Sequence, residues 1–226
     1  MQTFPPYESS VKPVQRGDLN VLRAIASNPS SFPEIVYFAD DQVVTIYDAF
    51  PKSRFHLLLL PRQYIPEVSW LAPCHVGLLQ HMIKVGTEIA TFLTQQYLKS
   101  KEEQTFMLGF HAIPSLDQLH MHIISTDFVS PFLKTRKHWN SFHTDFFLPA
   151  SYVLEELKAG RRLVPAKDRE KYVNLLKRPL LCHRCKESFQ NMKALKQHVS
   201  ECRQLFVAKQ ADASQGIIDK YFIKLN

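Results

Sequence analysis

The segment SLDQLHMHIIS, residues 115–125, places two histidines one residue apart in an otherwise apolar run. On a β-strand, alternate side chains point to opposite faces, so His120 and His122 would share one face with Gln118. A neutral imidazole can attack phosphorus once its second nitrogen is held by a hydrogen bond, and a second histidine can donate to the phosphate oxygens. The spacing therefore favours nucleophilic chemistry on phosphorus.

Two other interpretations fit the same residues. Adjacent imidazoles on one face can converge on a catalytic metal ion, but the nearby carboxylates, Asp117 and Asp127, are expected on the opposite face or beyond the strand. The pair can also be histidines of the core with satisfied hydrogen bonds. Taken alone, the pair leaves all three interpretations open.

The second chemical motif lies near the C-terminus and has the spacing Cys-x2-Cys-x12-His-x3-Cys. Two cysteines two residues apart and a His and a Cys four apart on a helix suit tetrahedral zinc. Phe189 and Leu195 provide the large apolar residues that so short a unit needs for a core. We predict one structural Zn²⁺ in a small ββα-type finger, with these ligands: Cys182, Cys185, His198 and Cys202.

The finger has an expected outer surface. Asn191, Lys193 and Gln197 would face outward from its helix, whereas His183 is expected to be exposed and not a ligand. One finger reads only about three base pairs, so we expect Lys193 to contact DNA phosphates without selecting a sequence. A protein-contact or purely structural role is the alternative.

Charge is distributed unevenly along the chain. The whole chain carries +7, whereas residues 134–203 contain 16 Lys or Arg against 7 Asp or Glu. Such a regional excess favours a polyanionic partner. The N-terminus lacks a basic start followed by an apolar run, and no apolar run approaches the roughly 20 residues that span a bilayer. We expect an intracellular protein without a membrane partner, in which Cys74 is a small buried side chain.

The remaining pattern predicts an α+β fold with an antiparallel sheet and one long helix, plus the finger. Apolar residues at helical spacing indicate a long helix over 75–98. Shorter helices are expected over 18–28 and 151–159, the latter followed by Gly160. The β-like runs are 34–38, 42–48, 55–62, 105–112 and the histidine segment. We divide the chain into a catalytic domain with an N-terminal helix, 1–160, and a basic linker with the finger, 161–226.

The run QLHMHIIS resembles the His-φ-His-φ-His-φ-φ signature of the histidine triad superfamily of nucleotide hydrolases and transferases, with Gln118 in the first position. The segments YDAFPKSRFHLLLLPR, GFHAIPS, STDF and LKTRKHWNSF, followed by the finger, resemble the DNA 5′-adenylate hydrolases of that superfamily. The resemblance implies a nuclear enzyme of single-strand break repair. It would remove AMP left on 5′ ends by abortive ligation, through a covalent histidine–AMP intermediate and without a catalytic metal.

The resemblance also implies roles for individual residues. His120 would be the nucleophile, and the transferred phosphate would be held by His122, His111 and Ser115. The nucleotide would be bound by Asp48, which accepts from the ribose hydroxyls, and supported by His56 and Gln118. Partners would be nicked or broken DNA ends, with AMP or GMP as the product ligand, and a monomer is expected.

The basic residues are expected to contact DNA. This group is Lys52, Lys134, Arg136, Lys137, His138 and Lys193. Trp139 is expected to pack between the two modules. A general nucleotide phosphoramidase or dinucleotide hydrolase is an alternative function, although a small substrate requires neither a finger nor a basic region. A non-catalytic protein that binds nucleic-acid ends is the other.

Overall fold

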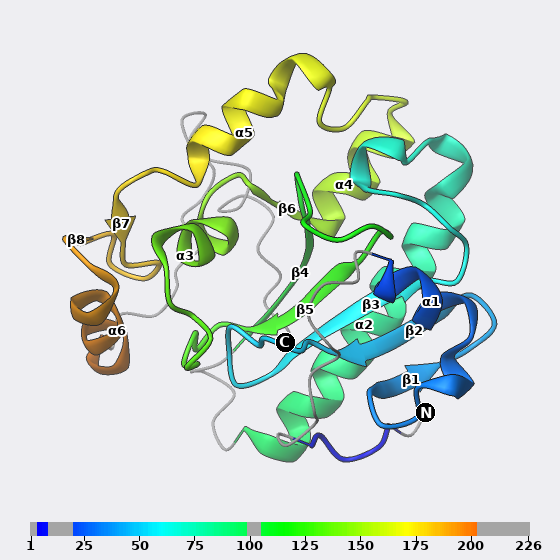
Figure 1. Ribbon diagram of the computed structural model, residues 1–226, viewed down its shortest axis with the longest axis horizontal. Helices are drawn as coiled ribbons and strands as arrows, with labels where there is room; N and C mark the ends of the chain where they lie inside the picture. Colours follow the sequence, from blue (N-terminus) through cyan, green and yellow to red (C-terminus); the bar gives the residue numbers. More distant parts are fainter. Residues whose placement is uncertain (1–3, 9–19, 99–104, 203–226) are drawn as a thin grey trace.

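The structure, a computed structural model, describes residues 4–8, 20–98 and 105–202. A six-stranded sheet crosses its centre in the order β1-β2-β3-β5-β4-β6, and each neighbouring pair of strands is antiparallel (Figure 1). Its strands are β1 (Val36–Ala39), β2 (Val43–Tyr47), β3 (His56–Pro61), β4 (Phe106–His111), β5 (Met121–Ser125) and β6 (Phe147–Pro149). The predicted α+β class and antiparallel sheet are confirmed.

The position of β3 in the sheet explains why residues 57–60 are all apolar. It pairs with β2 on one side and with β5 on the other, so it lies inside the sheet. Leu57 and Leu59 belong to the core on one face, whereas Leu58 and Leu60 pack with the helix that covers the other face. A strand buried on both faces has no solvent-facing positions for polar residues.

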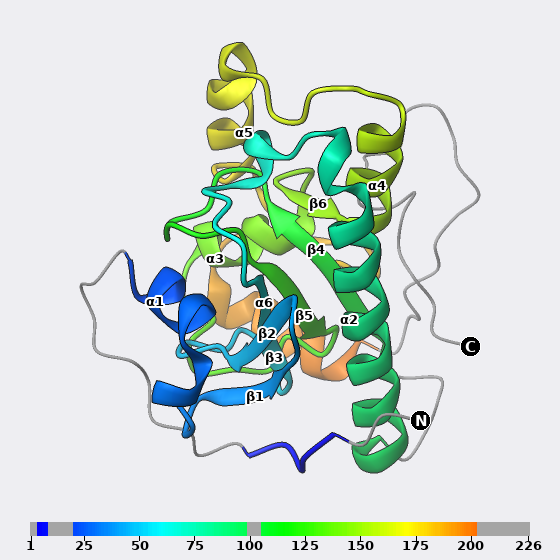
Figure 2. The ribbon, with the colours of Figure 1, turned by 90° about the vertical axis from the view of Figure 1, so that its right-hand side faces the viewer.

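One face of the sheet is covered by α2 (Val76–Tyr97) and α4 (Ala150–Lys158) (Figure 2). The predicted long helix is thus observed, and each of its buried residues from Leu79 to Leu93 has another buried residue three or four positions away. At Gly86 the helix lies very close to the sheet, because a Cβ placed there would be 2.8 Å from side-chain carbons of Leu108 and Met121.

The other face is covered in two separate places. Helix α1 (Val21–Ser27) packs on β2 and β3, and residues 18 and 19 of the helix expected over 18–28 lie outside the described residues. Helix α3 (Arg136–His143) covers the β4 and β6 side together with the C-terminal module. The outer surface of the central strands lies between these two helices (Figure 1).

The C-terminal module consists of β7 (Leu180–Leu181), β8 (Ser188–Phe189) and α6 (Met192–Glu201), which is the predicted ββα arrangement. Its core is shared with the body that contains the six-stranded sheet, because Leu180 and Leu195 are buried in one cluster with Trp139 and Phe142. The Trp139 indole N–H donates to the carbonyl of Leu181 at 2.9 Å. Trp139 therefore packs between the modules as expected, and the boundary at residue 160 stays a prediction.

Two expectations about single side chains were wrong. His183 is buried, at 4% exposed, because its ring lies against Phe128 and Trp139 at the junction of finger and body. Cys74 is exposed, since it lies in the short turn of helix ahead of α2.

The connecting segments complete the described chain. They contain the short 3-10 helices η1 (Pro29–Ser31), η2 (Val68–Trp70), η3 (Pro73–His75) and η4 (Ala166–Asp168), and helix α5 (Arg169–Leu175). Gly160 follows α4 with a φ of 68°, the left-handed conformation that ends a helix. None of the described helices has the length and apolar character needed to cross a membrane.

Candidate active site

Histidines from three adjacent strands meet on the face of the sheet that lies between α1 and α3. His56 begins β3, His111 ends β4, and His122 is the second residue of β5, with His120 just before that strand. The ring centroid of His122 lies 5.2 Å from that of His56, 4.3 Å from that of His111 and 5.3 Å from that of His120. Four residues predicted for the site are therefore brought together.

The protonation of His120 follows from one hydrogen bond. Its Nδ1–H donates to the main-chain carbonyl of Gln118 at 2.9 Å, and a carbonyl oxygen can only accept. The neutral ring therefore carries its free electron pair on Nε2. Burial lowers the pKa of His120 below its ordinary value of 6.5, so the ring is neutral at pH 7. The unprotonated nitrogen is the atom that a nucleophile requires.

A second chain of hydrogen bonds fixes His122 in the opposite tautomer. The main-chain N–H of Lys52 donates to Nδ1 of His56 at 3.1 Å, so the proton of neutral His56 is on Nε2. That Nε2–H lies 3.0 Å from Nδ1 of His122, which must accept, and the proton of His122 is therefore on its own Nε2. This donor is buried and has no partner among the described residues.

The imidazoles near His120 are held neutral by burial. Burial lowers the pKa of His56 to about 4, although Asp48 lies 3.5 Å away and acts in the other direction. The pKa values of His111 and His122 are lowered well below the ordinary value by burial and then by neighbouring histidines. The site thus pairs an electron-pair donor, His120, with a hydrogen-bond donor, His122.

The hydrogen bonds of His56 argue against a metal at this cluster. Asp48, His56 and His122 offer ligand atoms that all lie within 4.8 Å of one another. However, Nδ1 of His56 already accepts from Lys52, so Nε2 carries the proton and has no electron pair for a cation. The tautomers therefore suit chemistry without a catalytic metal.

The other two residues predicted to hold the phosphate lie on and after β4. His111 has its ring against Phe142 and Phe146, and its Nε2 is buried without a partner among the described residues. Ser115 is exposed, on the loop that leads from β4 towards β5.

Gln118 does not lie on the histidine strand, which corrects the predicted alternation. Strand β5 begins at Met121, and Gln118 has a φ of 87°, outside the range of a strand. Its side-chain amide donates to the carbonyls of Pro61 at 2.7 Å and Gln63 at 3.0 Å. The amide nitrogen of Gln118 therefore binds the end of β3 and the segment that follows it, and does not contribute to a polar face of β5.

The loop between β2 and β3 carries Asp48 and Lys52 into the site. The carboxylate of Asp48 accepts from the main-chain N–H of Phe50 at 2.7 Å, which fixes the turn. Lys52 is half-buried and its ammonium group donates to the carbonyl of Phe50. Burial lowers the pKa of Lys52.

One residue that supports the site was missed from the sequence. The buried carboxylate of Asp127 accepts from the main-chain N–H groups of Arg54 at 3.0 Å and Val129 at 2.9 Å, and from the hydroxyl of Ser125 at 2.5 Å. It thereby joins the start of β3 to the end of β5. The sequence signal for this role is the position of Asp127, which lies between the end of the apolar histidine strand and Phe128.

The residues predicted to contact DNA are mostly at the start of α3. Lys134, Arg136 and Lys137 are exposed there, and the hydroxyl of Thr135 caps the helix by accepting from the N–H of His138. Burial, and then the charge of Lys52, lowers the pKa of His138. Lys193 is exposed on α6.

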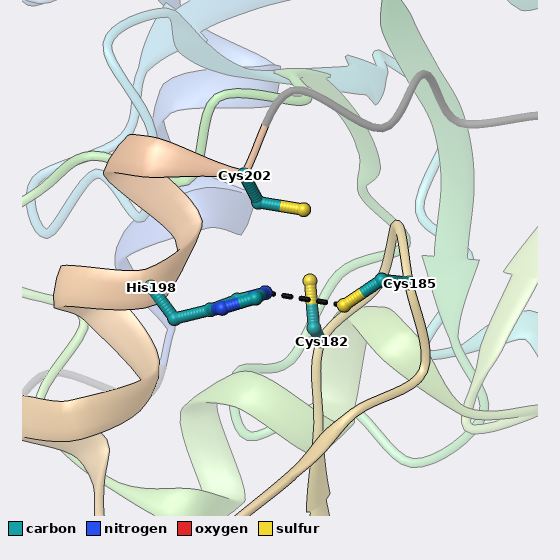
Figure 3. Close-up of side chains that lie close together, drawn as sticks. All are labelled: Cys182, Cys185, His198 and Cys202. Carbon is teal, nitrogen blue, oxygen red and sulfur yellow. Dashed lines mark hydrogen bonds between the residues drawn. The ribbon is translucent and has the colours of Figure 1, made fainter.

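The predicted metal ligands converge in the finger (Figure 3). One ligand atom from each of the four residues lies within 4.8 Å of the others, and Sγ of Cys185 is 3.1 Å from Nε2 of His198. Nδ1 of His198 is 3.5 Å from a carboxylate oxygen of Glu187, which orients the ring as outer partners of metal ligands do. Three thiolates and one imidazole suit one structural Zn²⁺, held by Cys182, Cys185, His198 and Cys202.

Two protein families match the chain. The family described as scavenger mRNA decapping enzyme C-terminal binding matches residues 20–138, and the C2HE / C2H2 / C2HC zinc-binding finger matches residues 143–204. The finger match thus starts within α3, in agreement with the shared core.

Several similar relatives are named aprataxin or aprataxin-like protein. The chain is 42% identical over 172 residues to aprataxin of Ciona intestinalis, which covers 76% of this chain and 43% of the relative. It is 31% identical over 195 residues to the aprataxin-like protein of Schizosaccharomyces pombe, covering 80% of this chain and 79% of the relative. The chain spans about half the length of the animal aprataxins that it matches.

Solved structures agree with these relatives. The aprataxin ortholog Hnt3 from Schizosaccharomyces pombe superposes with a TM-score of 0.64 at 30% identity, covering 82% of this chain and 91% of that chain. The same ortholog in complex with DNA gives a TM-score of 0.61 at 30% identity, with 81% and 93% covered. A complex of Hnt3 with DNA and guanosine gives 0.56 at 27% identity, with 81% and 94% covered.

Proposed function

The chain belongs to the aprataxin family, and from this premise we propose that it hydrolyses 5′-adenylated DNA ends, releasing AMP and a 5′-phosphate. The observation that carries the proposal is the pair of opposite tautomers: His120 has its free electron pair on Nε2, His122 has its proton on Nε2, and the two ring centroids are 5.3 Å apart. The DNA complexes of the ortholog Hnt3 support a DNA substrate.

The first chemical step is attack by Nε2 of His120 on the phosphorus of the adenylate. A nitrogen–phosphorus bond forms, and the bond from that phosphorus to the bridging oxygen of the DNA 5′-phosphate breaks. The leaving phosphate is a weak base, so it needs little help from a general acid. Charge on the non-bridging oxygens is stabilised by the buried donor of His122, with His111 and Ser115 as further phosphate contacts.

The second step is hydrolysis of the histidine–AMP intermediate. Water adds to phosphorus and releases a proton to solvent, and the nitrogen–phosphorus bond breaks with its electron pair returning to Nε2 of His120. The Nδ1–H of His120 stays on the carbonyl of Gln118 throughout. Because the DNA fragment has already left, the two steps divide one difficult displacement into two easier ones. Asp48 is assigned to the ribose hydroxyls of the nucleotide, and Gln118 and His56 to the support of the histidines.

The DNA itself is assigned to the basic surface beside the site. The DNA phosphates would be neutralised by basic side chains that are exposed or lie near the histidines. These side chains are Lys52, Lys134, Arg136, Lys137, His138 and Lys193. The zinc finger positions the body on the duplex. We further propose a monomeric enzyme that acts in the nucleus.

The test is release of AMP from a nicked duplex that carries a labelled 5′-adenylate, without added divalent metal. EDTA is added only during the assay, and the zinc content is measured before and after. We expect release by the wild type and a loss of about 10³-fold or more in His120→Ala, because the nucleophile is removed.

Three outcomes contradict the proposal. Binding of the nick without release of AMP would mean a non-catalytic protein that binds DNA ends. Release of AMP from dinucleotides or phosphoramidates but not from DNA would mean a general nucleotide hydrolase. Full activity of His120→Ala would remove His120 as the nucleophile.

A further inference from the structure

Gln118 has an unusual main-chain conformation for its residue type. Its φ of 87° lies in the left-handed region, which glycine adopts readily and which costs other L residues energy. The residue is fully buried. A strained conformation persists only where surrounding contacts hold it.

The contacts that hold Gln118 come from its own side chain. The amide nitrogen donates to the carbonyls of Pro61 and Gln63, at 2.7 Å and 3.0 Å, which uses both of its hydrogens. The next residue is fixed to the same segment, because the N–H of Leu119 donates to the carbonyl of Ile65 at 2.6 Å. The chain around Gln118 is therefore tied to residues 61–65 by three hydrogen bonds.

This conformation determines where the carbonyl of Gln118 points. That carbonyl accepts from Nδ1–H of His120 at 2.9 Å and so fixes both the tautomer and the orientation of the nucleophile. We infer that Gln118 is a positioning residue, whose side-chain amide clamps its main chain so that its carbonyl holds His120 ready to attack. The inference rests on the proposed function and replaces the expectation that Gln118 binds the nucleotide.

The clamp explains how a glutamine serves in the first triad position. The role requires two donors aimed at carbonyls and a main-chain oxygen aimed at the nucleophile, and it requires no contact with phosphate. The side-chain oxygen of Gln118 has no partner among the described residues, so it contributes nothing to the clamp. A contact between that oxygen and a bound nucleotide is the competing role.

The test compares Gln118→Met, which keeps the length but removes the donors, with Gln118→Gly, which accepts a positive φ without strain. Asp117→Asn is the matched control, because its side chain accepts from the Tyr64 hydroxyl, which an asparagine oxygen can also do, and makes none of the three hydrogen bonds of the clamp. Formation of the histidine–AMP intermediate is measured in single turnovers on adenylated DNA. Displacement of a nucleophile by about 1 Å can cost about 10²-fold, so we expect a loss of roughly 10-fold to 100-fold in Gln118→Met. AMP affinity should be unchanged within about twofold, and Gln118→Gly should be more active than Gln118→Met.

Two further measurements separate positioning from a purely structural role. The carbonyl stabilises protonated His120, so its displacement in Gln118→Met shifts the acid limb of the rate profile to lower pH. The Nδ1 proton of His120 should give a downfield NMR resonance in the wild type and in Asp117→Asn, and lose it in Gln118→Met. The NMR measurement needs no substrate, so it tests the clamp even if the wild type leaves adenylated DNA intact.

Three results would overturn the clamp. They are a Gln118→Met rate within twofold of wild type, a loss explained entirely by weaker AMP binding, and an unchanged Nδ1 resonance. If Gln118→Met fails to fold, Gln118→Leu, which also lacks the amide donors, decides by the same criteria.

Discussion

His120 and His122 are the same residue type, yet their Nε2 atoms differ in protonation: that of His120 has a free electron pair, whereas that of His122 carries a proton. The difference arises from main-chain groups: a carbonyl accepts from His120, whereas an amide of Lys52, acting through His56, makes His122 an acceptor at Nδ1. Neither hydrogen bond involves a charged partner. The division of roles between nucleophile and donor is therefore set by the local backbone.

This arrangement predicts how activity depends on pH. His120 must be neutral to attack, and burial lowers its pKa below 6.5. The single-turnover rate should therefore be flat from pH 8 to about 6.5 and reach half its maximum below pH 6.5. The measurement is the rate of AMP release between pH 4.5 and 8.

A control separates titration from unfolding. Burial lowers the pKa of these histidines in the folded state, so below about pH 6.5 they take up protons when the chain unfolds. The fold is therefore most stable above about pH 6.5, and it loses this stability as the pH falls towards the folded pKa values. Circular dichroism at each pH identifies the range in which the protein is folded. A half-maximal rate above pH 6.5 in that range contradicts the prediction.

At the scale of elements, the site depends on how closely α2 packs against β4 and β5. Gly86 allows this approach, because a Cβ there meets Leu108 and Met121 at 2.8 Å. We expect Gly86→Val to lower the free energy of unfolding by about 1–3 kcal/mol through overpacking. Urea unfolding monitored by fluorescence measures the change.

Gly77 is the matched control in the same helix. A Cβ at Gly77 meets nothing within 4 Å, so Gly77→Ala should raise the free energy of unfolding by up to about 1 kcal/mol through helix propensity. Equal effects of the two substitutions would show that contact with the sheet does not matter at Gly86.

At the scale of the whole molecule, the finger and the catalytic body share one core. Leu180, Cys182 and Leu195 of the finger are buried in the same cluster as Trp139 and Phe142. The main-chain carbonyl of Ser130, in the body, also accepts from the ammonium group of Lys196 at 2.7 Å. Zinc that holds the finger together should therefore stabilise the body as well.

Removal of zinc should lower the melting temperature of the entire described fold. Zinc present at about 1,000 times its dissociation constant contributes about 4 kcal/mol, which corresponds to roughly 10 °C for a chain of this size. Differential scanning calorimetry with and without a zinc-specific chelator measures the shift. The control is Cys74→Ser, which changes an exposed cysteine that is not a predicted zinc ligand. This substitution should leave the melting temperature and the shift on zinc removal unchanged. An unchanged melting transition of the body after zinc loss would contradict the prediction.

Patterns between near neighbours in the sequence determined much of this protein. The zinc ligands, the long helix, the paired histidines and the basic region could all be predicted, because spacing along a helix, strand or knuckle fixes which side chains lie together. The tertiary structure decided what depends on contacts between distant segments. It buried His183 at the junction of finger and body and placed Gln118 outside the strand. It also set the tautomer of His122 through His56 of β3 and the main chain of Lys52. These are properties of hydrogen bonds and burial that form only when separate elements pack, so no local pattern encodes them.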